Sequence, residues 1–286
     1  MLSVVSQEQS SSNRRFVLQL PDRSLIEAVL YREDTLCISC QVGCAVRCPF
    51  CASGANGLGR SLTLDEMVAQ VDLVPGLRGV TLSGIGEPLH NPECVRLLEH
   101  ARERGLRVTL TTSGGPIARL REWLVRPHHG LTISIHAGSE AARARAVPNG
   151  PDLASVFDTL RDLVPRLTRA RRKKTALAYL VIAGLNDSDD EIDAFVEHAR
   201  PLGLFVHLYA YNPVPTSEHR AVDRARFEAI YARMTGSGLT VRMSARARLE
   251  ANGGCGTLVA LKRPIRAKPA TVADEEECPR STSPGR

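Results

Sequence analysis

The sequence predicts an α/β protein built on a parallel sheet. Short apolar, β-branched runs alternate six times with longer amphipathic runs, several of which open on Thr, Asp or Ser in a helix-capping position. The expected strands are residues 36–43, 79–83, 106–112, 131–136, 175–183 and 205–210, and the expected helices include 63–74, 92–104, 153–167, 188–201 and 222–235. Since a closed barrel needs eight such units, six predict an open, partial (β/α)6 barrel with its active site at the carboxyl ends of the strands.

Local composition divides the 286-residue chain into tails, a core and two short flanking segments. Residues 1–14 and 266–286 are polar and lack periodicity, so both are expected to be disordered tails. Residues 15–36 are interpreted as a short N-terminal β extension, 37–245 as the barrel, and 246–265 as a C-terminal loop and strand that contains Cys255.

The overall composition suggests where the protein works. The chain has no apolar run near the roughly 18 residues of a membrane span and no signal-peptide core, so we expect a cytoplasmic monomer without membrane contact. Eight cysteines in such a chain favour metal-binding or redox chemistry over structural disulfides. A net charge of +6 permits a nucleic-acid partner, although solvated basic faces are also common.

Three cysteines carry the strongest chemical signal. Cys44, Cys48 and Cys51 have the spacing C-x3-C-x2-C, which suits three corners of a [4Fe-4S] cluster and leaves one iron open to a small molecule. The alternatives are a zinc knuckle or scattered buried thiols. Zinc would require a fourth ligand at pairable spacing, and Cys37 and Cys40 lie upstream at no recognised finger spacing.

Polar motifs follow four of the predicted strands. They are Gly-Ile-Gly-Glu-Pro at 84–88, Thr-Thr-Ser-Gly at 111–114, Ser-Ile-His at 134–136 and Tyr-Asn-Pro at 211–213. Each alone has a plain structural explanation, such as a turn or a satisfied core histidine. Because the carboxyl ends of parallel strands meet at one edge, their joint placement predicts a cofactor pocket.

With these motifs, the chain resembles radical S-adenosylmethionine (SAM) enzymes and, within them, the RlmN/Cfr family of adenine methyltransferases of ribosomal and transfer RNA. The resemblance runs from about residue 15 to 263 and rests on CISCQVGCAVRCPFCASG at 37–54, GIGEPL at 84–89, LTISIHA at 131–137, GLND at 184–187, YNP at 211–213 and CG at 255–256. It implies a partial radical SAM barrel and two cofactors, a three-cysteine [4Fe-4S] cluster and SAM.

The resemblance also implies residue roles. Cys44, Cys48 and Cys51 would hold the cluster. The residues implied to contact SAM are Gly86, Glu87, Ser113, Ser134, Ile135, His136 and Asn212. Cys255 would carry a methyl group, Cys37 would be its partner thiol, and Glu27 would be the proton acceptor.

In the family scheme, Cys255 takes a methyl group from one SAM molecule, and a radical from a second SAM removes a hydrogen from that methyl group. The methylene radical adds to an sp2 carbon of adenine. Glu27 then removes the ring proton. Attack of the Cys37 thiolate on the Cys255 sulfur releases the product and leaves a disulfide, which cellular thiols reduce. A reductant such as flavodoxin or ferredoxin would supply the electron.

Two features depart from the family pattern. The family normally begins with a helical accessory domain, whereas in this sequence only about fifteen residues precede the β extension, and 147–150 looks shorter than the family's basic loop. A basic run could contact phosphates or be a solvated helix end; it comprises Arg166, Arg169, Arg171, Arg172, Lys173 and Lys174. Aromatic residues are 4% of the chain and do not interleave with basic residues as in base-stacking surfaces.

Three functional interpretations therefore stand. The first is methylation of adenine in rRNA or tRNA by the two-cysteine route. The second is the same chemistry on a small nucleotide, peptide or natural product, favoured by the missing accessory domain. The third, a non-catalytic cluster protein, is disfavoured because Glu27, Cys37 and Cys255 occur together.

Overall fold

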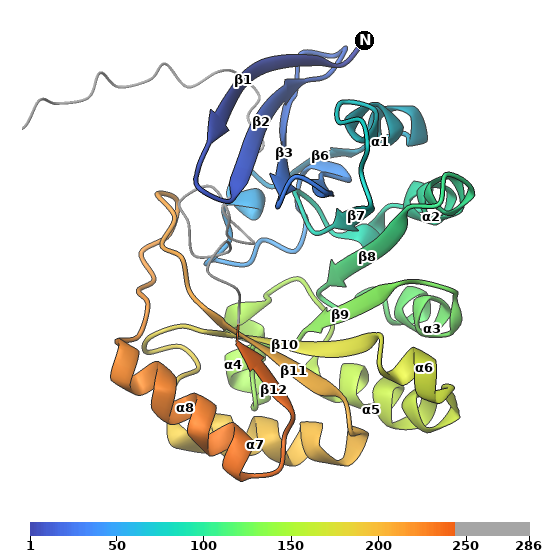
Figure 1. Ribbon diagram of the computed structural model, residues 1–286. Helices are drawn as coiled ribbons and strands as arrows, with labels where there is room; N and C mark the ends of the chain where they lie inside the picture. Colours follow the sequence, from blue (N-terminus) through green and yellow to red (C-terminus); the bar gives the residue numbers. More distant parts are fainter. Residues whose placement is uncertain (244–286) are drawn as a thin grey trace, which may run out of the picture.

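The computed structural model describes residues 1–243 and places one large mixed sheet inside an arc of helices (Figure 1). The ten strands of the large sheet follow the order β1-β2-β3-β4-β7-β8-β9-β10-β11-β12. Pairing is antiparallel from β1 to β4 and parallel from β4 to β12. The predicted α/β fold with an open, partial barrel and an N-terminal β extension is therefore confirmed.

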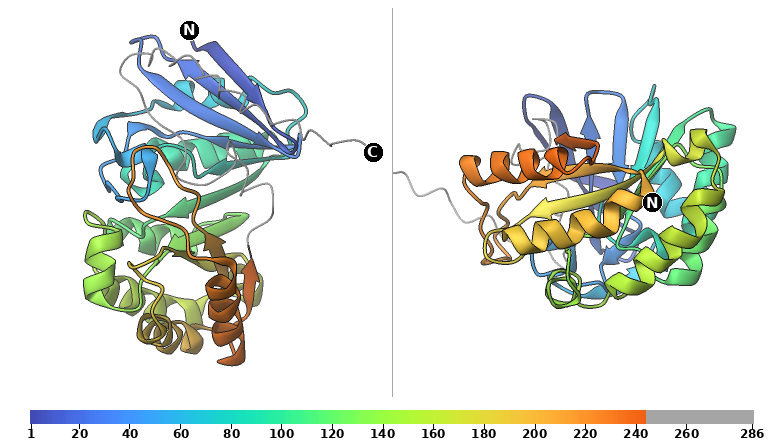
Figure 2. Two further views of the ribbon diagram at one scale, coloured as in Figure 1. Left: turned by 90° about the vertical axis from the view of Figure 1, so that its left-hand side faces the viewer. Right: turned by 90° about the horizontal axis from the view of Figure 1, so that it is seen from below.

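The strands are β1 (Ser3–Gln9), β2 (Asn13–Gln19), β3 (Leu25–Tyr31), β4 (Thr35–Ile38), β5 (Gln41–Gly43), β6 (Leu58–Ser61), β7 (Gly79–Leu82), β8 (Arg107–Thr112), β9 (Gly130–Ser134), β10 (Thr175–Val181), β11 (Phe205–Ala210) and β12 (Val241–Met243). The α-helices are α1 (Leu64–Val71), α2 (Glu93–Glu103), α3 (Ile117–Val125), α4 (Glu140–Ala146), α5 (Leu153–Leu163), α6 (Arg169–Arg172), α7 (Asp189–Ala199) and α8 (Arg224–Gly236). Two further views show the helices along the outer side of the sheet (Figure 2).

The N-terminal segment differs from the prediction. Residues 1–14 were expected to be disordered, but β1 pairs with β2 from Ser3 to Gln9, and β2 begins at Asn13. All seven side chains of β1 are exposed, so the strand has no apolar alternation for a sequence pattern to reveal. Main-chain pairing and a 2.8 Å ion pair between Glu8 and Arg15 join it to β2 instead.

The strand predicted over 36–43 is two strands. The side chain of Gln70 in α1 accepts from the Ser39 amide at 2.9 Å and donates to the Ser39 carbonyl at 3.0 Å. The Cys40 amide donates a hydrogen bond to the Ile85 carbonyl, at 2.9 Å. These bonds end β4 at Ile38, and β5 pairs with β6 in a separate two-stranded sheet.

Helix starts follow their capping residues. Thr63 and Glu66 form a reciprocal capping box at α1, and side chains of Asp152, Ser188 and Asp223 accept backbone N–H bonds at α5, α7 and α8. Helix α3 follows β8, where the six-fold alternation implies a helix, and the structure adds α4, α6 and the short strands β6 and β12, which were not among the predicted elements. In the described part of the chain, no helix combines the length and apolar content needed to cross a bilayer.

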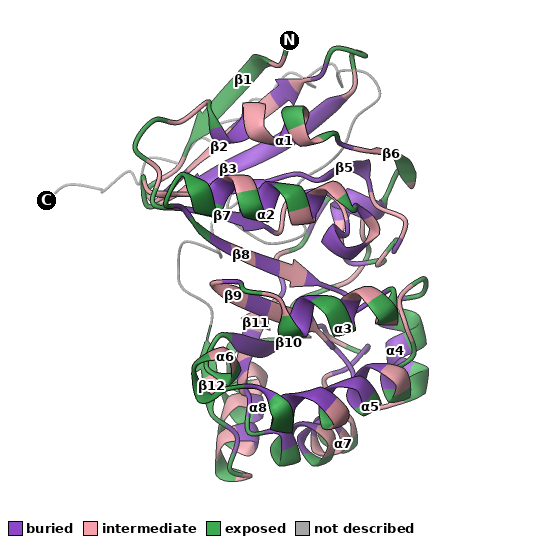
Figure 3. Cartoon of the chain, turned by 90° about the vertical axis from the view of Figure 1, so that its right-hand side faces the viewer, coloured by how far each residue is buried: buried purple, intermediate pink, exposed green. Residues whose placement is uncertain are grey.

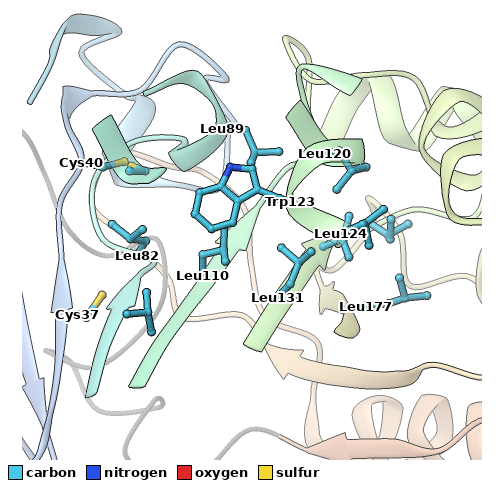
Figure 4. Close-up of a cluster of buried hydrophobic side chains, with 14 of the residues drawn as sticks. Cys37, Cys40, Leu82, Leu89, Leu110, Leu120, Trp123, Leu124, Leu131 and Leu177 are labelled. Carbon is cyan, nitrogen blue, oxygen red and sulfur yellow. The ribbon is translucent and has the colours of Figure 1, made fainter. Parts of the chain in front are cut away.

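The two faces of the parallel sheet carry different side chains. On the outer face, Trp123 of α3 lies among leucines that include Leu110 and Leu131 (Figure 4), and α2, α3 and α5 turn buried residues inward and exposed residues outward (Figure 3). On the inner face between β8 and β10, cross-strand partners are small or hydroxylated, as with Thr111 beside Thr132 and Ser134 beside Ala178. Closed barrels fill this space with bulky branched residues. Here it stays open.

Candidate active site

A cavity lies at the carboxyl ends of the parallel strands, as predicted. It encloses about 1100 Å³, including its open mouth. The side chains around it come from the cysteine loop and from the ends of five strands: Cys44, Val46, Cys48, Phe50, Cys51, Ser53, Ser83, Gly84, Gly86, Glu87, Thr111, Thr112, Ser113, Ser134, His136, Val147, Ala178, Leu180, Tyr209, Ala210 and Asn212. The four polar motifs predicted to converge contribute to this lining, the last through Asn212.

The three cysteines follow β5 in a loop closed by glycines. Gly43 has φ +80°, and a Cβ there would lie 1.8 Å from the Gly57 carbonyl oxygen. The adjacent Cys44 amide donates to that oxygen at 3.0 Å. Asn149, in the loop after α4, donates to the Ala45 carbonyl at 3.0 Å and holds the loop from the other side.

The surroundings of the cysteines are apolar. Cys44, Cys48 and Cys51 pack against a buried cluster that includes Val46 and Phe50. Burial raises the pKa of Cys44 to about 12, and burial with the neighbouring thiols raises that of Cys48 well above its usual range. Thiolates in such a place require a cation to compensate them, and the iron of a bound cluster would supply that charge.

The donor set suits a cluster rather than one ion. Within residues 1–243, no three His, Cys, Asp or Glu side chains are arranged to hold a single metal ion. A zinc site needs four converging ligands, whereas thiolates of a cubane cluster bind different irons. Cys44, Cys48 and Cys51 fit the second arrangement, since all three line one cavity.

Glu87 is fixed at the cavity wall by its neighbours. Its Oε1 accepts from the Thr112 hydroxyl at 2.5 Å and from the Leu89 amide at 3.1 Å, while Oε2 accepts from the Ser113 amide at 2.7 Å. The Glu87 amide donates to Gln41 Oε1 at 2.9 Å. These bonds tie the turn after β7 to the end of β8, so a carboxylate faces the cavity in one orientation.

Two features of the cavity wall beside Glu87 bear on a ligand. Gly86 has φ +111°, and a Cβ there would lie 2.7 Å from Gln41 and 2.9 Å from the Cys40 sulfur, so only glycine fits the turn. The buried Ser113 hydroxyl lines the cavity and has no hydrogen-bond partner in the described structure. An unpaired buried hydroxyl is costly, and a polar cofactor would satisfy it. The residues present therefore fit SAM.

His136 is held in a strained, left-handed conformation, with φ +57°. Its Nδ1 accepts from the Leu180 amide at 3.0 Å, and its carbonyl accepts from Asn186 Nδ2 at 2.8 Å. Burial, with the nearby Arg143, lowers the pKa of His136 to about 3. The ring is therefore neutral, with its proton on Nε2, and packs edge-on to Phe50.

Arg143 in α4 is a site residue that the sequence did not single out. It is 1% exposed, and its guanidinium donates to the carbonyls of Ser113, Ser134, Ile135 and Pro151 at 2.6–3.1 Å. Burial lowers its pKa to about 10. The side chain ties the ends of β8 and β9 together. An arginine between two alanines, with a second arginine two residues later, carries no sequence signal for such a role.

Cys37 lies beside the cavity, and Glu27 lies on the same, inner face of the sheet. The pairing of Val29 with Cys37 places Glu27 on the same face as the thiol, two residues along β3. The Cys37 sulfur is 3.3 Å from the Ser83 hydroxyl, which lines the cavity. Arg15 lies 3.9 Å from the Glu27 carboxylate.

Other predicted residues are placed differently. Ile135 is buried outside the cavity lining, and its amide donates to the Ala178 carbonyl at 3.0 Å. Cys255 lies outside the described residues, as do segments 246–265 and 266–286. In the basic run, Arg171 donates to carbonyls at the end of α3, and Arg166 pairs with Asp162 at 2.6 Å. At least two of its six cations therefore serve local structure.

Comparisons with known proteins agree with this site. Residues 38–198 match the model of the Radical SAM superfamily. A solved radical SAM methyltransferase from Sphaerobacter thermophilus superposes with a TM-score of 0.79 at 28% identity, covering 90% of this chain and 81% of that one. The fold and site thus define a radical SAM enzyme.

Relatives narrow the class. The chain is 33% identical to a probable RNA methyltransferase of Azoarcus sp. over 90% of its own length and 76% of the relative's. It is 32% identical to the dual-specificity RNA methyltransferase RlmN of Solidesulfovibrio magneticus, over 88% and 76% respectively. The protein belongs to the RlmN-like family of radical SAM methyltransferases.

Proposed function

We propose that this enzyme methylates an sp2 carbon of adenine in ribosomal or transfer RNA, with Cys255 as methyl carrier. The observation that carries the proposal is that the Cys37 sulfur lies 3.3 Å from the Ser83 hydroxyl, which lines a cavity that fits the cluster and SAM, with Glu27 on the same face of the sheet. The names of the relatives support RNA as substrate.

Cys44, Cys48 and Cys51 would hold the cluster, and the turn at Gly86 and Glu87, the Ser113 hydroxyl and Asn212 would hold SAM. When bound, the cluster and SAM supply a carbon radical able to remove a hydrogen from an unactivated methyl group. Arg143 keeps the ends of β8 and β9 in place around these groups.

The chain's own residues complete the reaction. The Glu27 carboxylate accepts the proton that leaves the adenine ring, with Arg15 beside it, and the radical adduct returns its odd electron to the redox partner that supplied one for SAM cleavage. The Cys37 thiolate attacks the Cys255 sulfur, the bond from that sulfur to the substrate methylene carbon breaks, and a disulfide forms. The electron pair of the broken bond stays on that carbon, which takes up a proton and becomes the methyl group. External thiols then reduce the disulfide and return both cysteines to the starting state.

Mass spectrometry of a Cys37→Ala variant tests this route, because removal of the partner thiol traps the adduct. A nucleotide fragment on the peptide that contains Cys255 is the expected result and also identifies the substrate. A small metabolite on Cys255 would replace RNA with another substrate. Bare Cys255 would contradict the carrier role. Cys94→Ala, which removes a buried thiol in α2, is the matched control.

A further inference from the structure

Strand β11 carries a row of aromatic rings on the inner face of the sheet. Phe205, His207 and Tyr209 alternate with Val206 and Leu208, which are fully buried on the outer face. The ring centroids are 4.8 Å apart for Phe205 and His207 and 5.8 Å apart for His207 and Tyr209. The sequence suggested no interleaved aromatic and basic surface. The fold assembles one, because strand alternation selects every second residue.

A cation completes the row. Arg242 of β12 is exposed, lies beside His207 in the strand register, and places its guanidinium 4.5 Å from the centre of the Phe205 ring. In the described residues no carboxylate forms an ion pair with it. This is the cation–π geometry that arginine forms over an aromatic face.

The rings are accessible from the inner side. Phe205, His207 and Tyr209 are each partly exposed. Their partners across β10 are Ala176 for Phe205 and Ala178 for His207, whose methyl groups are too small to cover a ring. Tyr209 itself lines the cavity, so the row leads from the cavity down the length of β11.

From this geometry we infer that the row formed by Phe205, His207, Tyr209 and Arg242 is a stacking surface for the RNA bases next to the target adenine. The inference rests on the proposed function and adds how the substrate is gripped. Single-stranded RNA is bound by bases stacked on aromatic and arginine planes, with cations near its phosphates. A row that starts at the cavity wall would hold the flanking nucleotides while the adenine enters the cavity.

Charge favours RNA over other occupants of this surface. Arg242 adds a positive charge at the far end of the row, and the whole chain carries a net charge of +6. Both complement a polyanion. An apolar peptide would gain little from His207 and Arg242.

The double variant Phe205→Leu/His207→Leu tests the surface, with a short oligoadenylate that contains one 2-aminopurine as the probe. In the wild-type holoenzyme the fluorescence of 2-aminopurine should be quenched by stacking. In the double variant the quenching should disappear and binding should weaken by at least about 10-fold, since each stacked base contributes about 1–3 kcal/mol. Phe227→Leu, which removes a partly buried ring from the outer helix α8, should leave both unchanged.

Arg242→Gln should weaken binding and reduce its salt dependence, whereas Arg224→Gln, at a 91% exposed site on α8, should do neither. Reductive cleavage of SAM by each variant, measured without RNA, separates the stacking surface from the proposed function, because SAM cleavage does not require the aromatic row. If the double variant binds the oligoadenylate as tightly as the wild type and still methylates RNA, the stacking surface is overturned and the proposed function stands. Joint loss of thermal stability and SAM cleavage in the double variant would show that the rings serve packing, and would also overturn it. Failure of the wild type to bind or methylate RNA would overturn the proposed function itself.

Discussion

The inner and outer faces of one sheet do different work in this molecule. Along β9, Leu131 and Ile133 point outward and are fully buried, whereas Thr132 and Ser134 point inward and are partly exposed. The outer face buries the apolar area that stabilises the fold. The inner face gives up such packing for space and hydrogen-bonding groups. Residues next to each other in the sequence therefore have different roles: the outward ones stabilise the fold, and the inward ones line the space where a ligand would bind.

The largest expected effect breaks the chemistry and leaves the fold. Cys44→Ala should abolish reductive SAM cleavage, because the cluster loses one of three ligands. The free energy of unfolding of the apoprotein should change by less than about 1 kcal/mol, as at other sites outside the core. Iron content after anaerobic reconstitution and chemical denaturation measure the two effects. Cys94→Ala, on the outer side, should keep its iron; equal iron loss in both variants would refute the assignment.

A neighbouring pair sharpens the comparison. Leu131→Ala should lower the free energy of unfolding by about 2–5 kcal/mol, because it opens a cavity in the outer core. Thr132→Ala, one residue away, should cost about 1 kcal/mol or less, because its side chain is partly exposed on the inner face. Urea unfolding of both variants measures the difference. Similar losses would show that the inner face is packed as tightly as the outer.

Arg143 joins the two roles. Arg143→Met should cost about 2–3 kcal/mol, because several buried carbonyls lose a charged donor. The same change should weaken SAM binding, because the hydrogen bonds from Arg143 no longer hold the ends of β8 and β9 together. Calorimetric titration with SAM and denaturation provide the two readouts. Arg145→Met, on the exposed side of α4, is the control; a stability loss with unaltered SAM affinity would limit Arg143 to packing.

The smallest expected effect is a pH dependence far from the cavity. His128 is 5% exposed, neither ring nitrogen has a partner in the described structure, and burial with Arg171 and Lys174 lowers its pKa to about 4. The unfolded chain takes up this proton below about pH 6.5, before the folded chain does, so acid destabilises the fold. The loss should reach about 2 kcal/mol at pH 5.

Denaturation of wild type and His128→Gln at pH 7 and pH 5 isolates this contribution, because the other histidines are common to both proteins. The stability of the variant should fall less on acidification. Equal slopes for the two proteins would mean that His128 is solvated in solution.

Much of the fold followed from local patterns, and the parts that did not share a cause. Buried strands, and capped helices such as those that begin after Thr63 and Ser188, can be predicted from patterns among neighbouring residues. Strand β1 is held by pairing, and the break after Ile38 depends on Gln70 in a later helix. The predicted SAM-contacting residues gather at the cavity except for Ile135.

The site residues that were missed have the same origin. Arg143 acts through carbonyls of three separate segments, and Arg242 joins the aromatic row only once β12 pairs with β11. The position of neither arginine follows from spacing along the chain, because both depend on contacts made by tertiary structure. The alternation of Phe205, His207 and Tyr209, by contrast, is present in the sequence. Motifs of fixed spacing, such as the three cysteines, can be recognised in the sequence without knowledge of the tertiary structure.

The register of β11 links folding to recognition. A slip of one residue against β10 would turn Phe205, His207 and Tyr209 toward the outer helices and expose Val206 and Leu208 inside. The cost of exposing those two aliphatic side chains is what keeps the rings on the inner face. For the proposed stacking surface, selection on Val206 and Leu208, which would contact no substrate, is thus also selection on how RNA is held.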